Sequence, residues 1–267
     1  MASILVSVGE ASSDRQAAGV IRALNGEHQL FGKVGDHLAD LGVEPVVGLR
    51  GQIGLSSPLR MLRELREDRR RLLAEVDARG TKVALLVDYS GFHLPLGRAL
   101  RARGVKVIGF IPPKLWAWGG WRLKKARAAY DELFTILPFE ADWWQARKVP
   151  AAYVGNPIAD ECPAVESDPE GPVALLPGSR ASELEHVGPL LAQSARHMLT
   201  MDADVQFNVA VAPTLDRSAV EATFAGLPVT YVERLRDAVS GASAALVCMG
   251  TAGLETALIG TPNVLTY

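Results

Sequence analysis

The chain has 267 residues, of which 48% are hydrophobic, and a formal net charge of -2. A chain of this length forms one large or two ordinary domains and buries a sizeable core. The small net charge excludes a bulk attraction to nucleic acid, so no nucleic-acid partner is expected. The two cysteines, Cys162 and Cys248, do not have the spacing of a metal site. So few cysteines are typical of proteins in a reducing compartment.

The N-terminal residues have neither the basic start nor the long apolar core of a signal peptide. No stretch approaches the roughly 18 uncharged apolar residues of a membrane-spanning helix. If the protein meets a membrane, we expect it to do so from the surface.

The first half of the chain alternates short apolar runs with longer helical patterns. The predicted strands are Ser3–Val8, Lys82–Val87, Val105–Ile111 and Glu132–Leu137. The predicted helices are Asp14–Leu24, Leu94–Ala102 and Phe139–Ala146. This alternation predicts a parallel sheet covered on both faces.

The segment Pro58–Arg79 is rich in arginine and carries a leucine stripe at helical spacing. It is interpreted either as an amphipathic helix docked on the domain or as a face that meets anionic lipid headgroups. Its acidic residues dilute the positive charge and favour docking.

A stretch rich in proline and acidic residues, 160–172, is interpreted as a linker between a domain of residues 1–159 and a domain of residues 173–267. The α/β alternation resumes after it. The predicted strands are Val173–Leu176, Val205–Val211, Val229–Val232, Ala244–Cys248 and Asn263–Tyr267. The predicted helices are Ser182–Leu199, with a break at Gly188-Pro189, Asp216–Phe224 and Thr251–Ile259. Because the sequence ends on a strand, the second domain is expected to be incomplete.

Two acidic residues follow predicted strands of the first domain, where open α/β sheets bind ligands. Asp88 follows an apolar strand and suits a general base, or else it caps the next helix. Glu10 is interpreted as a second catalytic acid or as an ordinary exposed loop residue. Its loop lacks the G-x-G-x-x-G pattern, which disfavours a nicotinamide enzyme. Ser12 is a candidate substrate contact or, with its two C-terminal neighbours, a helix cap, whereas His93 is expected to cap or pack.

Further substrate contacts are predicted from a segment that combines tryptophans with cations. Trp116 and Trp118 suit stacking on a sugar, and Arg122 suits an anionic group. The alternative for both tryptophans is a buried aromatic anchor. Asn156, in a turn after a strand, is expected either to bond to substrate or to stabilise its own turn.

Two strand-to-helix turns in the second domain predict phosphate binding. In the first, Gly178, Ser179 and Arg180 offer backbone N–H groups, a helix N-terminus and a guanidinium fork. In the second, Gly250, Thr251 and Ala252 offer further N–H groups, and Glu255 lies one turn along the helix, where ribose hydroxyls are its expected partners. Plain strand-to-helix turns remain the alternative.

Two such turns suit a pyrophosphate between a nucleoside and a sugar. The sequence therefore predicts an α/β protein with two Rossmann-like domains, of the GT-B glycosyltransferase type. No Asp-x-Asp metal motif stands where a cation would be needed, so we expect no metal or other cofactor, and Arg180 with the helix N-termini neutralises the leaving diphosphate.

The motifs also resemble those of the lipid-A-disaccharide synthase family over nearly the whole chain, most weakly at 31–58. They are GEASSD, VDYSGFHLPLGRAL, PPKLWAWGGWRLKKA, LPFEADWW, VGNPIAD, LPGSRASELEH and MGTAGLETALIGTPNVLTY. The resemblance implies an inverting transfer from UDP-2,3-diacylglucosamine to 2,3-diacylglucosamine 1-phosphate, with release of UDP. It also implies a peripheral location at the inner, cytoplasmic face of the membrane, and a homodimer where the family's C-terminal helices are present.

By this resemblance, Asp88 corresponds to the base, Arg180 to the phosphate ligand and Glu255 to a glutamate of the nucleotide half. The sequence departs from the family pattern at four positions that bear on the acceptor: Ser13 and Gly119 replace glycine and arginine, Gly91 replaces a second aspartate, and Asn156 replaces histidine. The alternatives are therefore another UDP-sugar enzyme, such as a different glycosyltransferase or a UDP-N-acetylglucosamine 2-epimerase, and a non-catalytic module that binds UDP or lipid.

Overall fold

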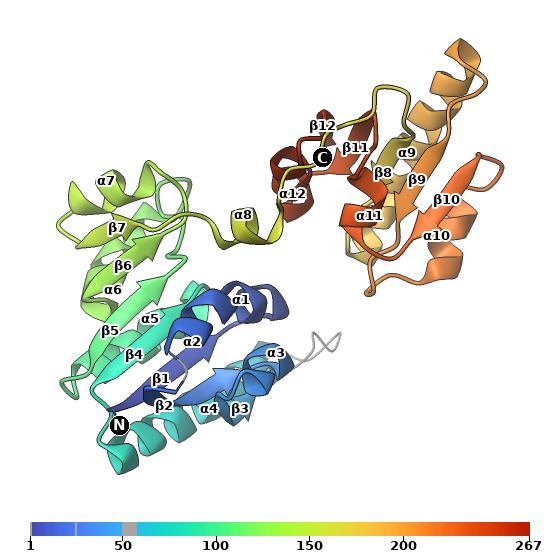
Figure 1. Ribbon diagram of the computed structural model, residues 1–267. Coiled ribbons are helices and arrows are strands. Elements are labelled where there is room, and N and C mark those ends of the chain that lie inside the picture. Colours follow the sequence, from blue (N-terminus) through green and yellow to red (C-terminus); the bar gives the residue numbers. More distant parts are fainter. Residues whose placement is uncertain (1, 25, 50–57) are drawn as a thin grey trace. The chain divides into compact units, whose positions relative to one another are not determined.

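The computed structural model describes residues 2–24, 26–49 and 58–267 (Figure 1). Contacts within the chain divide it into two units, Met1–Pro157 and Ile158–Tyr267, which are described separately. Each unit contains one parallel sheet with helices on both faces. Among the described helices, none is both long and apolar enough to cross a membrane.

The Met1–Pro157 unit has a seven-stranded parallel sheet in the order β3-β2-β1-β4-β5-β6-β7. Its strands are β1 (Ala2–Val8), β2 (His28–Val34), β3 (Glu44–Gly48), β4 (Val83–Val87), β5 (Lys106–Phe110), β6 (Glu132–Thr135) and β7 (Ala151–Tyr153). The order runs outward in both directions from β1 and β4, which is the Rossmann pattern, and it creates a topological switch point between these two strands.

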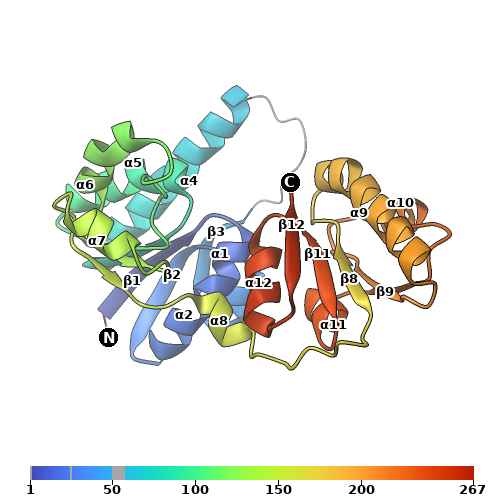
Figure 2. The ribbon, with the colours of Figure 1, turned by 90° about the horizontal axis from the view of Figure 1, so that it is seen from above.

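Helices cover both faces of this sheet (Figure 2). They are α1 (Ala11–Gln16), α2 (Ala18–Leu24), α3 (Asp36–Asp40), α4 (Pro58–Arg79), α5 (Ser90–Arg101), the 3-10 turn η1 (Gly120–Arg122), α6 (Leu123–Ala129) and α7 (Glu140–Gln145). One core packs the four helices from α4 to α7 against the sheet, and its buried residues include Leu72, Leu96 and Trp144. A second core lies under α1 to α3 and includes Ile21 and Leu38. Burial on both faces explains why the strand sequences are continuously apolar.

Helix α4 docks on the sheet, as one of its two interpretations requires. Leu72 and Val76 are buried, and Lys33 of β2 forms a buried ion pair with Asp68 of α4, with 2.9 Å between Nζ and Oδ2. Arg79 donates two hydrogen bonds to the Glu44 carboxylate of β3.

Several predicted boundaries in this unit are wrong. The predicted helix Asp14–Leu24 begins earlier, at Ala11, and is divided at Ala17; the predicted helix Leu94–Ala102 begins at Ser90. The sequence patterns do not predict three strands of this sheet. Strands β3 and β7 lie at its edges and are short and partly exposed, and β2 is an inner strand whose buried residues begin at Leu30.

The Ile158–Tyr267 unit has a five-stranded parallel sheet in the order β10-β9-β8-β11-β12. Its strands are β8 (Val173–Leu176), β9 (Phe207–Ala210), β10 (Val229–Val232), β11 (Ala244–Cys248) and β12 (Asn263–Thr266). Its helices are α9 (Ala181–Met201), α10 (Arg217–Thr223), α11 (Leu235–Val239) and α12 (Thr251–Ile259); α8 (Pro157–Glu161) lies at the boundary of the two units. The strand order again places a switch point between two central strands, β8 and β11.

Two cores cover the faces of the second sheet, one with α9 and α10 and the other with α11 and α12 (Figure 2). The expected break at Gly188-Pro189 is wrong, because α9 continues through both residues. Gly188 is buried, and a Cβ placed there would lie 2.9 Å from Cγ2 of Thr223. Close packing of α9 on α10 therefore requires the small residue at position 188, and the helix continues past the proline. Within 160–172, Val165 donates its N–H to the Ile259 carbonyl and packs against the core of this unit.

Candidate active site

The loops that carry Glu10 and Asp88 lie side by side at the switch point of the first sheet. Val8 of β1 pairs with Val87 of β4, so both loops leave the sheet at the same height. A Cβ placed on Gly9 would lie 2.2 Å from Cβ of Tyr89, so only glycine permits this approach. Burial raises the pKa of Tyr89, and the charge of Glu10 raises it further.

The Asp88 backbone is held from two sides. Its N–H donates to the Phe110 carbonyl at 3.0 Å, and its carbonyl accepts a 2.6 Å bond from Nδ1 of His93. Asp88 and Tyr89 have positive φ angles, 54° and 45°, which side-chain-bearing residues rarely adopt. The carboxylate of Asp88 remains exposed while its backbone is fixed. Asp88 is not the helix cap considered as its alternative, because Tyr89 is the N-cap residue of α5.

His93 is fully buried and packs, as expected for it. A carbonyl accepts only, so Nδ1 carries the proton, and in the neutral ring Nε2 accepts from Oγ of Ser7 at 2.9 Å. Burial lowers the pKa of His93 to about 4, against the bond to Asp88, which raises it. The hydrogen bond between His93 and Ser7 could not be predicted from the sequence, because the two residues lie on different elements.

Ser13 organises the Glu10 loop. Its buried hydroxyl accepts from the N–H groups of Gly9 and Glu10 and donates to the Glu10 carbonyl. The N-cap residue of α1 is therefore Glu10, and the expectation of a cap at Ser12, Ser13 or Asp14 is wrong. Asp14 instead accepts N–H groups at the start of α3, including that of Gly35 at 2.8 Å. Ser12 is exposed on α1 next to Glu10.

Arg122 joins the loop after β5 to the Asp88 loop. Its Nη2 atom donates to Oγ of Ser90 at 3.0 Å. Burial raises the pKa of Tyr130, the charge of Asp88 raises it further, and the charge of Arg122 opposes this. Both charges therefore lie within electrostatic reach of one phenol. The structure thus brings three predicted residues, Glu10, Asp88 and Arg122, to one edge of the first sheet.

The two predicted tryptophans differ in their surroundings. The Nε1 atom of Trp116 donates to the buried carboxylate of Glu140 at 2.8 Å, and its ring meets Phe139 edge to face. Trp118 is 68% exposed, so the alternative of a buried anchor is wrong for it. Asn156 is half-buried between β7 and α8.

In the second unit, the two predicted phosphate turns flank the switch point between β8 and β11. Leu176 pairs with Val247, so the turns that follow the two strands leave the sheet together. Gly178 has a φ of 105°, which favours glycine. Ser179 and Arg180 precede the 21-residue helix α9, and the Arg180 side chain is 70% exposed.

A carboxylate of the protein occupies the N–H groups of the first turn. Oε2 of Glu183 accepts from the N–H groups of Ser179 at 2.7 Å and Arg180 at 3.1 Å, and its other oxygen accepts from the Arg180 guanidinium at 2.6 Å. Burial raises the pKa of Glu183, but these bonds outweigh it and hold the pKa below its usual value. The turn therefore binds an anionic oxygen. Glu183 was not among the predicted site residues, because nothing in the local sequence distinguishes it from an ordinary helix residue.

The second turn opens α12. Gly250 is its N-cap residue, so the N–H groups of Thr251 and Ala252 stand at the helix start, where no carbonyl lies four residues back in the helix. Glu255 is half-buried one turn further along. Burial raises the pKa of Cys248, just before this turn; Glu183 raises it further and Arg180 lowers it. The two turns are therefore electrostatic neighbours.

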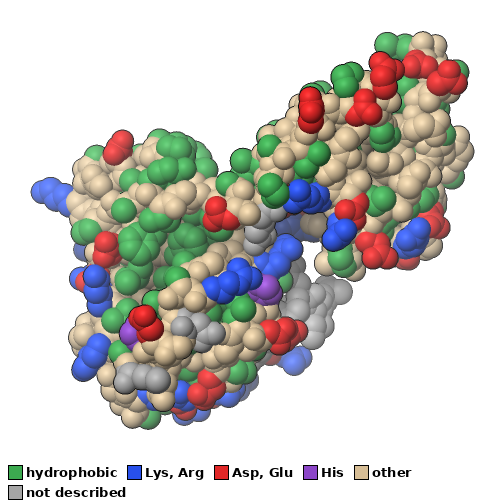
Figure 3. Space-filling model, in the orientation of Figure 1, with side chains coloured by type: hydrophobic (Ala, Val, Ile, Leu, Met, Phe, Trp, Pro, Cys, Tyr) green, Lys and Arg blue, Asp and Glu red, His purple; other side chains and the backbone are tan. Residues whose placement is uncertain are grey.

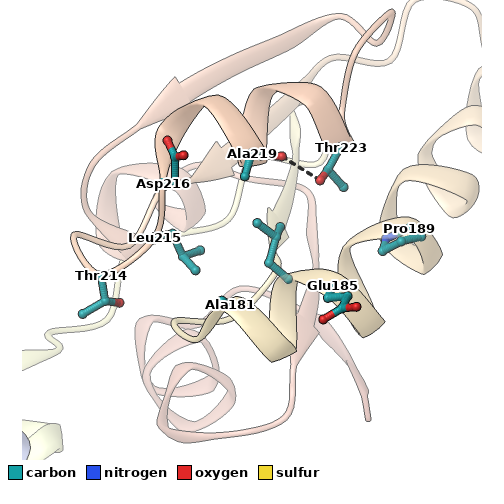
Figure 4. Close-up of a pocket in the computed structure, with 9 residues that line it drawn as sticks. Ala181, Glu185, Pro189, Thr214, Leu215, Asp216, Ala219 and Thr223 are labelled. Carbon is teal, nitrogen blue, oxygen red and sulfur yellow. Dashed lines mark hydrogen bonds between the residues drawn. The ribbon is translucent and has the colours of Figure 1, made fainter. Parts of the chain in front are cut away.

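A separate hollow of about 290 Å³ lies between α9 and α10 (Figure 4). Its lining is mostly apolar and includes Leu184, Leu215 and Ala219, with none of the predicted site residues. Thr214, at its rim, donates to the Ser179 carbonyl and so braces the first phosphate turn. The hollow therefore lies beside the first phosphate turn and is lined by none of the residues predicted to bind the ligand.

No cluster of metal-binding side chains occurs within the described ranges. The Asp-x-Asp sequence at Asp202 and Asp204 precedes β9, at the edge of the sheet opposite the phosphate turns.

Two Rossmann-type units, each with paired loops at its switch point, define the GT-B fold class. Solved structures share this fold. CalG4, the calicheamicin glycosyltransferase, matches with a TM-score of 0.66 and 15% identity over 100% of this chain and 80% of its own. The UDP-GlcNAc 2-epimerase from Neisseria meningitidis matches with a TM-score of 0.66 and 10% identity over 98% of this chain and 82% of its own.

The chain belongs to the lipid-A-disaccharide synthetase family, whose model matches residues 4–267. The lipid-A-disaccharide synthase of Myxococcus xanthus is 33% identical over 99% of this chain and 74% of its own length. That of Anaeromyxobacter sp. (strain K) is 35% identical over 99% of this chain and 74% of its own length. The family resemblance read from the motifs is thereby confirmed.

Proposed function

We propose that the protein forms the lipid A disaccharide by transferring 2,3-diacylglucosamine from its UDP derivative to 2,3-diacylglucosamine 1-phosphate. The family membership supports the reaction. The observation that carries the site assignment is that the predicted loops flank both switch points, where open α/β sheets bind ligands.

In the proposed mechanism, the acceptor hydroxyl attacks C1 of the donor sugar and gives its proton to the Asp88 carboxylate. The bond from C1 to the diphosphate oxygen breaks with inversion, and UDP leaves with the bonding electrons. The fixed Asp88 backbone supports this role, since a base must be held at one position relative to its substrate. Glu10, beside the same switch point, is proposed as the second catalytic acid.

We assign the diphosphate to the two turns of the second unit. Gly178, Ser179 and Arg180 contact one phosphate, and Gly250, Thr251 and Ala252 contact the other. The Glu183 carboxylate on the first turn supports this assignment, because it shows an oxyanion on those N–H groups. Glu255 is proposed to accept bonds from the ribose hydroxyls. Arginine and the N–H dipoles stabilise the leaving group, so no metal is required.

The acceptor side is assigned to Ser12, Trp116, Trp118, Arg122 and Asn156. Arg122 is proposed to hold the acceptor's 1-phosphate, since its guanidinium already reaches the Asp88 loop. The acylated substrates lie in a bilayer, so the protein is proposed to act at the cytoplasmic membrane surface. It is proposed to form a homodimer where the family's C-terminal helices are present.

The test is transfer from labelled UDP-2,3-diacylglucosamine to the sugar 1-phosphate in detergent micelles, with product analysis. Asp88→Asn is expected to lower turnover by about 100-fold or more, because the hydroxyl loses its proton acceptor. Arg180→Ala is expected to weaken UDP binding and turnover together. Full turnover in both variants would overturn the mechanism. A product without a new glycosidic bond would indicate an epimerase, and UDP binding without any product would indicate a binding module.

A further inference from the structure

Tyr130, the residue between α6 and β6, carries a hydroxyl that the fold itself does not use. The residue is 4% exposed, and its ring belongs to the core beneath α5 and α6. Among the described residues, none forms a hydrogen bond with this hydroxyl. Within the same residues, the side-chain polar atoms that are both sealed from solvent and unpaired belong to His28 and Trp144, so the Tyr130 oxygen keeps contact with solvent. Buried polar groups are nearly always paired, so an unpaired hydroxyl at the tip of a buried ring requires a partner from outside.

The ring of Tyr130 points along β5 toward the carboxyl edge of the sheet. The next residue, Asp131, donates its N–H to the Val107 carbonyl at 2.9 Å, which places the Tyr130 backbone near the start of β5. A Cβ placed on Gly109, two residues further along β5, would lie 2.9 Å from Cδ1 and 3.0 Å from Cε1 of Tyr130. The missing side chain of Gly109 therefore makes room for the ring, and the hydroxyl lies toward the end of the strand.

The charges around the hydroxyl agree with this direction. The charged groups that shift the pKa of Tyr130 are Asp88 and Arg122, which follow the carboxyl ends of β4 and β5. Arg101 and Asp131, which form an ion pair at the opposite end of the sheet, are not among them. The hydroxyl therefore lies at the predicted acceptor side of the site.

Three kinds of hydrogen-bond donor come together at this point. Burial raises the pKa of Tyr130, so its hydroxyl keeps its proton at neutral pH and donates. Arg122 adds a guanidinium that is fixed to Ser90, the first residue of the 12-residue helix α5. The N–H groups of Ser90 and Gly91 stand at the helix start, where the helix dipole favours an anion. A phosphate oxygen suits all three donors, on the side of Arg122 that is away from the Asp88 carboxylate.

On the face of this unit shown in Figure 3, cations and carboxylates are interspersed. Recognition of a phosphate there depends on particular donors and not on a broad basic surface. We propose that Tyr130 is a specificity-determining contact for the acceptor, and that its hydroxyl donates a hydrogen bond to the acceptor phosphate held by Arg122. The inference rests on the proposed function and adds a second donor to its acceptor site. Because the phosphate and the attacking hydroxyl belong to one sugar, this contact also keeps that hydroxyl near Asp88.

The experiment compares Tyr130→Phe with the parent protein in the micelle transfer assay. The substitution keeps the ring and removes only the hydroxyl. The KM for 2,3-diacylglucosamine 1-phosphate is expected to rise about tenfold, as for the loss of one hydrogen bond to a charged group, while kcat and the donor KM stay within about twofold. Tyr231→Phe, which removes a phenol hydroxyl from β10 of the other unit, is the matched control and is expected to keep all three constants within about twofold. An unchanged acceptor KM in Tyr130→Phe, or a fall in kcat at constant KM, would overturn the proposal.

An acceptor analogue without phosphate tests which part of the acceptor the hydroxyl contacts. Unphosphorylated 2,3-diacylglucosamine is added as a competitor, and its inhibition is expected to be the same, or equally absent, in Tyr130→Phe and the parent. A tenfold weaker inhibition in the variant would show that the hydroxyl contacts the sugar and would overturn the proposal.

Urea unfolding separates the binding role from a structural one. An unpaired hydroxyl does not stabilise the fold, so Tyr130→Phe is expected to keep or raise the urea midpoint, and a lower midpoint would overturn the proposal. Titration of the sugar 1-phosphate without donor separates the contact from the proposed function. A parent protein that binds this sugar through Tyr130 but transfers nothing would contradict the proposed function and leave the contact standing, whereas transfer by Tyr130→Phe at the parent KM would do the reverse.

Discussion

At the scale of single residues, Glu183 determines the conformation of the first phosphate turn before the nucleotide binds. Its carboxylate lies on the two N–H groups and the guanidinium that we assign to a phosphate. An incoming diphosphate must displace it, because two anions cannot share these donors. The residue therefore holds the turn in its binding conformation and competes with the ligand.

Glu183→Gln is expected to tighten UDP binding about fivefold, since the amide keeps the shape of the cap and loses the like charge. Isothermal titration measures the dissociation constant. Glu185→Gln is the control, because it removes one charge from the same helix on the side of the α9–α10 hollow. An unchanged or weaker affinity in Glu183→Gln would show that the carboxylate acts only as a helix cap.

His93 makes the stability of the first unit depend on pH. Its pKa is about 4 in the folded protein and 6.5 in its ordinary state, so the unfolded chain binds the extra proton first. Its contribution is complete above pH 6.5 and is lost as pH falls toward 4, by roughly 3 kcal/mol in total.

We therefore expect the parent protein to lose more stability between pH 6.5 and 4.5 than His93→Asn, which cannot titrate there. Urea unfolding at a series of pH values measures this difference. Parallel curves for the two proteins would contradict the role assigned to His93. His93→Ala, which removes the donor to the Asp88 carbonyl, is expected to lower turnover more than it changes KM.

At the scale of elements, the first turn of α5 contains Gly91, which has space around it for a side chain. By the family resemblance, an aspartate is expected where this chain has Gly91. Apart from its chain neighbours and its own helix backbone, no described atom lies within 4 Å of a Cβ placed there. The position is in the first turn of a 12-residue helix, where glycine is unfavourable and a negative charge is stabilised by the helix dipole.

Gly91→Asp is therefore expected to raise the free energy of unfolding by about 1 kcal/mol. Gly91→Ala is the matched control, since it supplies helix propensity without charge, and the difference between the two isolates the dipole effect. Denaturant unfolding measures both. Destabilisation by the aspartate would show that repulsion from Asp88 outweighs the dipole.

At the scale of the whole molecule, each unit has its own sheet and cores, and the nucleotide turns belong to one of them. On adding UDP, we expect the strongest protection from hydrogen exchange in peptides that cover 176–183 and 249–255, because bound phosphates occupy N–H groups there. UDP at about 100 times its dissociation constant stabilises the folded unit by roughly 2.7 kcal/mol. Protection confined to the first unit would contradict the assignment.

The sequence predicted most of the central strands and the two strand-to-helix turns that we assign to phosphate, because buried parallel strands are continuously apolar and glycine marks the turns between strand and helix. It did not predict the inner strand β2, the edge strands β3 and β7 or the continuity of α9 through Pro189. Those features depend on which surfaces are covered by neighbouring elements, and Gly188 against Thr223 is one such contact.

The sequence by itself therefore determined the two α/β units, the family and the candidate residues, since each is written in local patterns of apolar, glycine and charged residues. Only the tertiary structure decided which residues act together. The strand orders bring Glu10 to Asp88 and Gly178 to Gly250. Folding also buries His93 under Asp88 and exposes Trp118 and Trp121. At Ser13, where the family pattern has glycine, it forms the hydrogen bonds that organise the Glu10 loop. These partnerships join segments that are far apart in the sequence, and the spacing of residues along the chain does not indicate which segments come close in space.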